Sequence, residues 1–251
     1  TGGSRGIGKS IARELAAEGV TVAICGRDST SIEESASELR RETGGKLIPL
    51  VCDTTDAGSV KAMVTEANRQ MGKIEILVNN AAAVGGLVGG LEGAKEEDLL
   101  LDINTKVFGY FRCAQEVAPY LKKAGWGRII NIAGTAARNA GTISGMRNLA
   151  LVHFTKTLSM ELGPYGINVN AIHPGETITE RSLPMYEEQA RREGGSVKEI
   201  MENIGGRLAI GRIVDSTEIA HITAFLCSPK SVAITGEAIT ANGGVGNSVF
   251  Q

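Results

Sequence analysis

The sequence predicts an α/β fold, a single doubly wound domain whose parallel sheet is flanked by helices on both faces. Short apolar runs rich in β-branched residues alternate along the chain with longer stretches in which apolar residues recur at helical spacing. Glycines, 33 among 251 residues, gather where the apolar runs end, as expected where strands turn into helices. Strands separated by helices imply right-handed crossovers, and therefore a parallel sheet that is covered on both faces.

The expected elements alternate along the whole chain. Each helix shows an apolar stripe, and the helices are expected over residues 7–18, 28–43, 60–71, 96–123, 144–162 and 216–226. Each strand is a short apolar run, and the strands are expected over residues 21–25, 47–52, 74–78, 128–132, 167–172 and 238–240. No linker or internal repeat interrupts this pattern, so residues 1–251 are expected to form one domain.

Two segments stand outside the alternation. Residues 176–207 are charged and contain Pro184 and Gly194, and they favour a mobile helical insertion over a substrate site, with an inert surface excursion as the alternative. The first residue is Thr1 rather than Met, and the first motif starts at once. We therefore expect a short segment, a strand, to precede Thr1.

Composition excludes several classes of protein. A formal net charge of −2 argues against nucleic acid or an anionic membrane as partner. No apolar run approaches the roughly 20 residues of a membrane-spanning helix. The four cysteines (Cys25, Cys52, Cys113 and Cys227) lack metal-ligand spacing, so we expect no metal site, buried reduced thiols and a cytoplasmic location.

The first eight residues, Thr1-Gly2-Gly3-Ser4-Arg5-Gly6-Ile7-Gly8, open the first helix. In a dinucleotide-binding loop, the first glycine permits a tight turn, the second lets the backbone approach a pyrophosphate, and the third allows close helix packing. The amides and the positive end of the helix dipole favour an anion. The candidate cofactor contacts in this loop are Gly2, Ser4, Arg5, Gly6, Ile7 and Gly8.

The residues after the next strand bear on the choice between NADP and NAD. An acidic residue at the strand tip would bind the ribose hydroxyls of NAD, but Gly26 takes that place and Arg27 follows. Arg27 and Arg5 are suited to hold a 2′-phosphate, because a guanidinium binds phosphate with two parallel hydrogen bonds. NADP is therefore the expected cofactor. NAD stays possible, with Asp28 reaching the ribose.

With these motifs the chain resembles the short-chain dehydrogenase/reductase family along nearly its whole length. The resemblance implies a Rossmann-type fold, a small-molecule substrate and pairing of subunits into a homodimer or homotetramer through helices 102–123 and 144–162. It adds further candidate cofactor contacts, carried by the segments 52–56, 79–82 and 173–179: Asp53, Thr54, Asn80, Ala81, Thr177 and Thr179. It also matches Asn104 to the active-site asparagine of the family, and the C-terminal segments 211–220, 234–236 and 242–244 to the family pattern.

The catalytic positions depart from this pattern. The family uses a serine after the strand that here spans 128–132, but Gly134 lies there, with Thr135 one place later. Aligning the following helix places Ser144 at the family's tyrosine and Asn148 at its lysine. The ungapped alignment places Arg147 and Leu151 there instead, and no tyrosine occurs between residues 120 and 165.

This departure matters because a carbonyl that accepts a hydride needs a proton as its oxygen becomes a hydroxyl, and a serine is a far poorer acid than a tyrosine beside a lysine. Asn104, Ser144 and Asn148 are the candidate catalytic residues. Other groups have two interpretations each. Tyr186 is an acid or an apolar lid anchor, and His173 is a pocket or a structural residue. Arg147 is a ligand of a carbonyl or carboxylate, or a surface or interface group.

Three classes of function follow from this sequence. The first is an NADP-dependent oxidoreductase that acts on a carbonyl/alcohol pair or an activated alkene through a non-standard active site. The second is a dinucleotide-binding sensor or pseudoenzyme without dehydrogenase turnover. The third is non-redox chemistry such as that of an isomerase or lyase.

Overall fold

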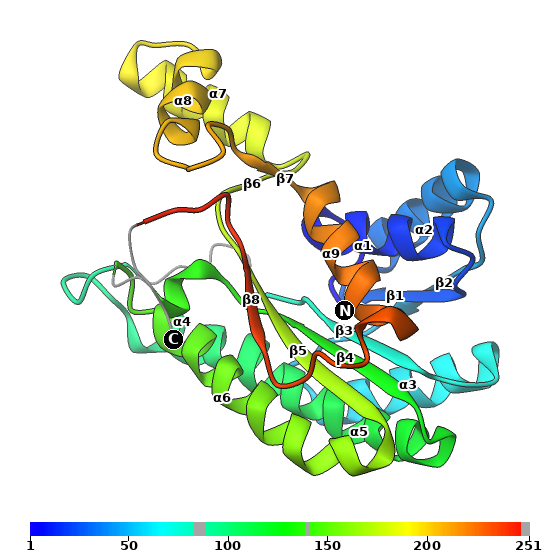
Figure 1. Ribbon diagram of the computed structural model, residues 1–251. Coiled ribbons are helices and arrows are strands. Elements are labelled where there is room, and N and C mark those ends of the chain that lie inside the picture. Colours follow the sequence, from blue (N-terminus) through cyan, green and yellow to red (C-terminus); the bar gives the residue numbers. More distant parts are fainter. Residues whose placement is uncertain (83–88, 139–140, 247–251) are drawn as a thin grey trace.

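The computed structural model describes residues 1–82, 89–138 and 141–246, and it confirms the α/β class (Figure 1). All strand pairs are parallel. Four strands form the central sheet in the order β3-β4-β5-β8, and β1 pairs with β2 beside them. These strands are β1 (Val22–Gly26), β2 (Leu47–Val51), β3 (Ile76–Asn79), β4 (Gly127–Ile132), β5 (Ile167–Pro174) and β8 (Ala238–Ala241).

Helices cover both faces of the sheet, as expected for a doubly wound domain. On one face lie α3 (Ala57–Met71), α5 (Gly109–Ala124) and α6 (Gly145–Leu162), with α4 (Glu96–Ile103) leading into α5. On the other lie α1 (Gly6–Ala17), α2 (Ser29–Thr43) and α9 (Ser216–Cys227). Short 3₁₀ turns occupy Thr135–Ala137, Gly163–Tyr165 and Pro229–Ser231. The sheet is apolar on both sides because each face packs against helices: Ile129 and Val169 face α5, and Ile130 and Ile172 face α1 and α9.

One expected helix is interrupted. The single helix predicted over 96–123 contains a π-helical turn, Asn104–Phe108, between α4 and α5. The amide of Gly109 donates to the carbonyl of Asn104, five residues back. A side chain at Gly109 would come within 3.1 Å of Thr54, so the close approach of this turn to Thr54 requires glycine. A π turn inserts one extra residue while the segment stays helical, so the sequence pattern predicted one continuous helix.

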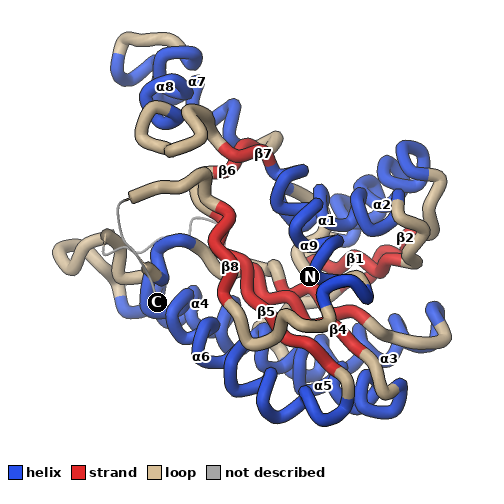
Figure 2. The backbone as a smooth tube through the Cα atoms, viewed as in Figure 1, coloured by secondary structure: helices blue, strands red, loops and turns tan. Residues whose placement is uncertain are grey.

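The segment 176–207 forms helices that stand apart from the sheet (Figures 1 and 2). It contains α7 (Ser182–Glu193) and α8 (Val197–Gly205), and its base is a two-stranded ladder of β6 (Thr177–Ile178) and β7 (Val214–Asp215). Its helices share a small apolar core made of Tyr186, Ala190, Ile200 and Ile213. We call residues 176–213 the lid. The expected helices are present, whereas strands of two residues are too short to show an alternating pattern.

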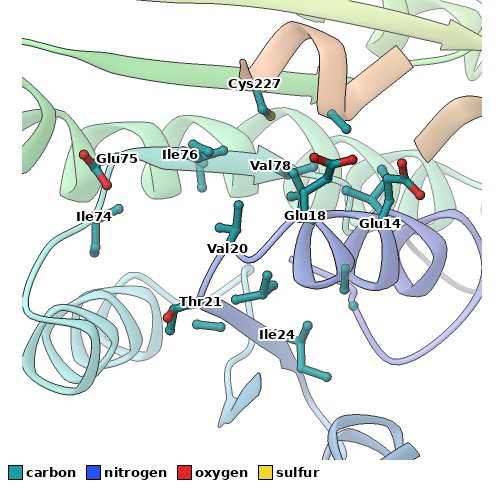
Figure 3. Close-up of a pocket in the computed structure, with 18 of the residues that line it drawn as sticks. Glu14, Glu18, Val20, Thr21, Ile24, Ile74, Glu75, Ile76, Val78 and Cys227 are labelled. Atoms are coloured by element: carbon teal, nitrogen blue, oxygen red, sulfur yellow. The ribbon is translucent and has the colours of Figure 1, made fainter. Parts of the chain in front are cut away.

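A cavity of about 1100 Å³ separates β1 from β3 (Figure 3). Its walls are mostly apolar and include Ile24 from β1 and Ile76 and Val78 from β3. Among the described residues, β1 pairs only with β2 and β3 only with β4, so their facing edges carry no ladder. The amino group of Thr1 donates to the carbonyl of Val78 at 2.8 Å, and the amide of Gly2 donates to Cys25 at 2.8 Å.

The four cysteines are free and buried, as predicted. They lie in the hydrophobic core on both sides of the sheet.

Candidate active site

The loop before α1 has the tight geometry that the glycine pattern predicts. Gly2 and Gly6 have positive φ angles of +64° and +58°. A Cβ on Gly8 would lie 2.2 Å from the carbonyl oxygen of Gly2, so only glycine fits there. The Asn80 side chain donates from Nδ2 to the carbonyl oxygens of Thr1 and Gly2 at 3.1 Å. The amide of Ala81 donates to the Thr1 hydroxyl at 3.0 Å. Asn80 and Ala81 therefore brace the loop.

The loop already holds an anionic group. The amide of Gly6 donates to Oε1 of Glu180, at the start of the lid, at 2.6 Å. Thr179, the preceding residue, lies beside Gly6, since a Cβ on Gly6 would be 3.8 Å from its methyl group. A carboxylate here is a stand-in for a cofactor phosphate, because backbone amides at a helix N-terminus bind anions of either kind. The residues present thus fit a dinucleotide pyrophosphate.

The side chains near the adenosine end support NADP. Asp28 caps α2, with its Oδ1 accepting from the amide of Ser31 at 2.7 Å. Arg27 and Arg5 are exposed at the mouth of the loop. Burial raises the pKa of Asp53, but hydrogen bonds from Thr55 and the charges of Arg27 and Arg112 outweigh that effect and leave it lowered. Arg27 therefore lies near Asp53.

The remaining predicted loop contacts have structural partners. The carbonyl of Ser4 accepts from the hydroxyl of Ser35 at 2.7 Å, which joins the loop to α2. Ile7 packs against the core between α1 and α9. Thr177 donates from its hydroxyl to the carbonyl of Gly175 at 2.9 Å. Thr177 and Thr179 together shape the turn into the lid.

Arg112 links two of the predicted site residues. Its guanidinium donates to the carbonyl of Thr54 at 3.1 Å and to Oδ1 of Asn104 at 2.9 Å. Thr54 is buried, and Asn104 opens the π turn. The structure therefore joins the predicted adenine-contacting turn to the predicted catalytic asparagine, a link that the sequence did not reveal.

Ser144, at the position predicted for the family's tyrosine, is part of a buried polar cluster. Its hydroxyl donates to Oδ2 of Asp102 at 2.9 Å, and Arg147 forms an ion pair with Oδ1 of the same carboxylate. Ser144 and Asp102 have no exposed surface, and Arg147 is 7% exposed. Burial lowers the pKa of Arg147. Arg147 is thus not a surface group. Asp102 is a functional candidate that the sequence reasoning missed.

Gly134, at the position predicted for the family's serine, faces Asn148. A Cβ on Gly134 would lie 2.9 Å from Nδ2 of Asn148, so the two predicted positions are adjacent. Asn148 is buried, and its Oδ1 has no hydrogen-bond partner among the described residues. The hydroxyl of Thr135 donates to the carbonyl of Pro174 at 2.9 Å, so its proton is engaged in the backbone rather than directed to a substrate.

His173 completes the edge of this region. Its Nδ1 lies 2.8 Å from the carbonyl oxygen of Gly134, which can only accept, so Nδ1 carries the hydrogen. Burial lowers the pKa of His173 to about 4, aided by the charges of Arg138 and Lys106. The ring is therefore neutral near pH 7, and its Nε2 has no partner in the described part of the chain.

A buried lysine lies beside these groups. Lys106, within the π turn, donates from Nζ to the carbonyl oxygen of Ala133 at 2.6 Å. It is 5% exposed, and burial lowers its pKa from 10.5 to about 8. Sequence reasoning missed Lys106. The only signal was its spacing of four residues from Asp102 on a helix whose inner face is otherwise apolar.

Tyr186 belongs to the lid core and not to the reacting region. It is 3% exposed, and its hydroxyl donates to Glu176 at 3.1 Å. Burial, with the charge of Glu176, raises its pKa to about 12. Of the two interpretations, the structure supports the lid anchor.

The described residues offer no group of three or more His, Cys, Asp or Glu side chains that could hold a metal ion. Within the same residues, no helix is both long and apolar enough to cross a membrane.

Comparisons with known proteins agree with this geometry. The family model described as enoyl-(acyl carrier protein) reductase matches residues 2–246. The short-chain reductase NovJ of Streptomyces niveus is 38% identical over 246 residues, which cover 97% of this chain and 91% of that protein.

Solved structures are similar along the whole chain. A variant of actinorhodin polyketide ketoreductase with NADPH has a TM-score of 0.88 and 32% identity, covering 98% of this chain and 95% of that one. The L-sorbose reductase of Gluconobacter frateurii, complexed with NADPH and L-sorbose, has a TM-score of 0.92 and 27% identity, covering 99% and 95%. The family match extends over almost every residue and includes the loop described above. The chain therefore belongs to the short-chain dehydrogenase/reductase family.

Proposed function

We propose that this protein is an NADPH-dependent reductase that converts a ketone to an alcohol. The observation that carries the proposal is the phosphate loop, whose glycines have the required φ angles and whose Gly6 amide already binds a carboxylate. Asp28 is engaged as a helix cap, and Arg5 and Arg27 are exposed beside the loop, which favours the 2′-phosphate of NADPH. The similar polyketide ketoreductase and L-sorbose reductase structures contain NADPH.

In this proposal the loop Thr1–Gly8 holds the pyrophosphate, while Asp53 and Thr54 contact the adenine. Thr177 and Thr179 lie on the side of the lid that approaches the cofactor. When bound, NADPH supplies the hydride. The ketone would lie at the carboxyl ends of β4 and β5, near Gly134 and Asn148, since ligands of open parallel sheets bind at this edge.

The active site is non-standard in this proposal. Ser144 and Asn148 occupy the positions of the family's tyrosine and lysine, and Asn104 keeps the place of its asparagine. Ser144 has its hydroxyl proton on Asp102. It therefore orients or accepts a hydrogen bond rather than acting as the acid.

The first experiment is a calorimetric titration with NADPH and with NADH. We expect NADPH to bind in the micromolar range and Arg27→Ala to weaken it by about tenfold, the loss of roughly 1.4 kcal/mol of phosphate contact. The exposed Arg41→Ala on α2 is the matched control and should leave the dissociation constant unchanged. Equal affinity for NADH and NADPH would contradict the assignment of the 2′-phosphate site.

The second experiment measures turnover. Acetoacetyl-CoA provides a ketone and crotonyl-CoA an activated alkene, and oxidation of NADPH is followed by absorbance. We expect oxidation with the ketone. Oxidation with crotonyl-CoA alone would shift the assignment to alkene reduction. Tight NADPH binding without oxidation by either compound would favour the alternative, a dinucleotide-binding sensor.

A further inference from the structure

Unused hydrogen-bonding groups gather around the end of β4. Asn148 Oδ1 and His173 Nε2 are buried acceptors without partners in the described ranges. Within the described residues Lys106 makes one hydrogen bond, to the carbonyl of Ala133, although an ammonium has three donors. Buried polar groups are normally satisfied, and unpaired ones mark either strain or a place for a ligand. Here Asn148, His173 and Lys106 surround the backbone of residues 133–134.

The other hydroxyl groups near this place are poor proton donors. Ser144 gives its proton to Asp102, and Thr135 gives its proton to Pro174. Tyr110 donates to the carbonyl of Ile132 at 2.9 Å, and burial raises its pKa well above 10. The His173 ring is neutral, and its Nδ1 hydrogen is directed to the carbonyl oxygen of Gly134.

Lys106 places a positive charge in the region of Asn148 and His173. Asp102, four residues before Lys106 in the sequence, is paired with Arg147, so its carboxylate is already balanced by a guanidinium. The charge of Lys106 acts on His173, which shows that the two groups are close. Asn148, at the position predicted for the family's lysine, is neutral. Lys106 therefore supplies a positive charge to a region from which the usual one has been lost.

Resting on the proposed function, we propose that Lys106 is the proton donor of this reductase. The carbonyl carbon of the substrate gains the hydride of the reduced cofactor, and its oxygen takes a proton from Nζ of Lys106. The neutral amine then regains a proton from water. The ketone is reduced, the cofactor is oxidised, and Asn148 and His173 accept hydrogen bonds from the substrate or from the water that restores the proton.

Burial sets the pH at which this donor works. In sequence, Asp102 and Tyr110 lie four residues before and after Lys106 on its own helical segment. Arg147 of α6 is paired with Asp102, and the charges of Lys106 and Arg138 both act on His173 of β5. Desolvation alone accounts for its pKa of about 8. An acid with such a pKa is protonated at pH 7 and still transfers its proton readily.

The test is a single-turnover measurement of NADPH oxidation by acetoacetyl-CoA in the full-length protein. We expect Lys106→Met to lose about 10²- to 10⁴-fold in rate, the usual contribution of a positioned acid. In the wild type the rate should fall as pH rises past about 8. Lys106→Arg should lose a similar part of the rate, because arginine keeps the charge but does not give up its proton. Lys156→Met, which changes an exposed lysine on α6, is the matched control and should retain the wild-type rate and profile.

A second readout does not depend on turnover. With lysines labelled at Cε with ¹³C, one NMR signal should be absent from Lys106→Met and should titrate near pH 8 in the wild type. NADPH affinity and the circular dichroism of Lys106→Met should match the wild type, which shows that the variant is folded. If that variant does not fold, Lys106→Arg carries the same test.

The outcomes separate the two proposals. A wild type that oxidises no NADPH with the ketone refutes the proposed function before any variant is made. A wild type that turns over while Lys106→Met keeps its rate within twofold overturns the assignment of Lys106 alone. A kinetic pH break that differs from the NMR titration of Lys106 also overturns it.

Discussion

Lys106 carries its charge at a place where burial opposes charge, and this has a consequence for stability. Its pKa of about 8 in the native state lies below the 10.5 of an ordinary lysine. Between these two pH values the unfolded chain holds a proton that the native protein has released. The free energy of unfolding should therefore rise with pH across this interval, by up to about 3 kcal/mol. Below pH 8 the full penalty of burying the ammonium applies.

The measurement is urea unfolding of the wild type and of Lys106→Met at pH values from 7 to 10.5. The difference between the two proteins isolates Lys106, because the other lysines and tyrosines titrate in both. We expect the wild type to gain stability relative to the variant as pH rises. A constant difference would mean that Lys106 titrates as an ordinary lysine.

The Glu180 carboxylate accepts a hydrogen bond from the Gly6 amide, the group proposed to bind a cofactor phosphate. The exposed carboxylate competes with the pyrophosphate, so Glu180→Gln should lower the dissociation constant of NADPH. We expect a change of roughly fivefold, which corresponds to about 1 kcal/mol, the upper range for an exposed charge pair. Calorimetry measures it without turnover, and Glu187→Gln, on the exposed side of α7, is the control. Equal affinities for wild type and Glu180→Gln would show that the carboxylate and the phosphate do not share the Gly6 amide.

At the scale of elements, the sequence predicted the six strands of the two main sheets and their intervening helices to within two or three residues at most ends. It did so because buried parallel strands and amphipathic helices leave continuous patterns. The π turn was not predicted because it keeps the segment helical, and the ladder of β6 and β7 was not predicted because strands of two residues are too short to show an alternating pattern. Lys106 and Glu180 were missed for a different reason: each owes its role to a partner distant in sequence, Ala133 and Gly6.

The cofactor loop was the most predictable part of the candidate site, because glycine is required there by φ angles and close contacts within one segment. The catalytic region was less predictable. Sequence alignment located Ser144 and Asn148, but only the fold shows that Ser144 shares Asp102 with Arg147. Interactions among side chains from α4, α6 and β4 have no local signature in the sequence.

The surface of α6 supports the predicted pairing of subunits. Met146, Leu149 and Met160 follow one face of the helix and are 54%, 57% and 71% exposed. Phe108 and Phe111, near the start of α5, are also exposed. Such an apolar surface on two neighbouring helices is typical of an interface between subunits. The homodimer or homotetramer stays a prediction.

Light scattering of the purified protein tests this prediction. We expect a dimer or tetramer for the wild type and a shift towards monomer for Leu149→Asp, because a buried carboxylate without a partner opposes association. Val232→Asp changes another exposed apolar residue, 68% exposed and outside these helices, and should leave the mass unchanged. A monomeric wild type at tens of micromolar would contradict the prediction.

At the scale of the whole molecule, the cavity between β1 and β3 divides the sheet. Backbone amides at unpaired sheet edges exchange with solvent quickly, whereas those in a ladder are protected. Hydrogen exchange should therefore be fast on the facing edges of β1 and β3. Slow exchange on these edges would contradict this prediction. The amides of β4, paired on both sides, are the internal reference.

The lid leaves and rejoins the body of the protein at one place, the ladder that pairs Thr177 with Val214 and Ile178 with Asp215. It also has an apolar core of its own around Tyr186 and Ile200. A segment built in this way is exchangeable. Replacing it with the corresponding segment of a related reductase, joined at the same ladder, would change what covers the substrate without altering the sheet. Substrate preference can therefore diversify in this architecture without changes to the sheet.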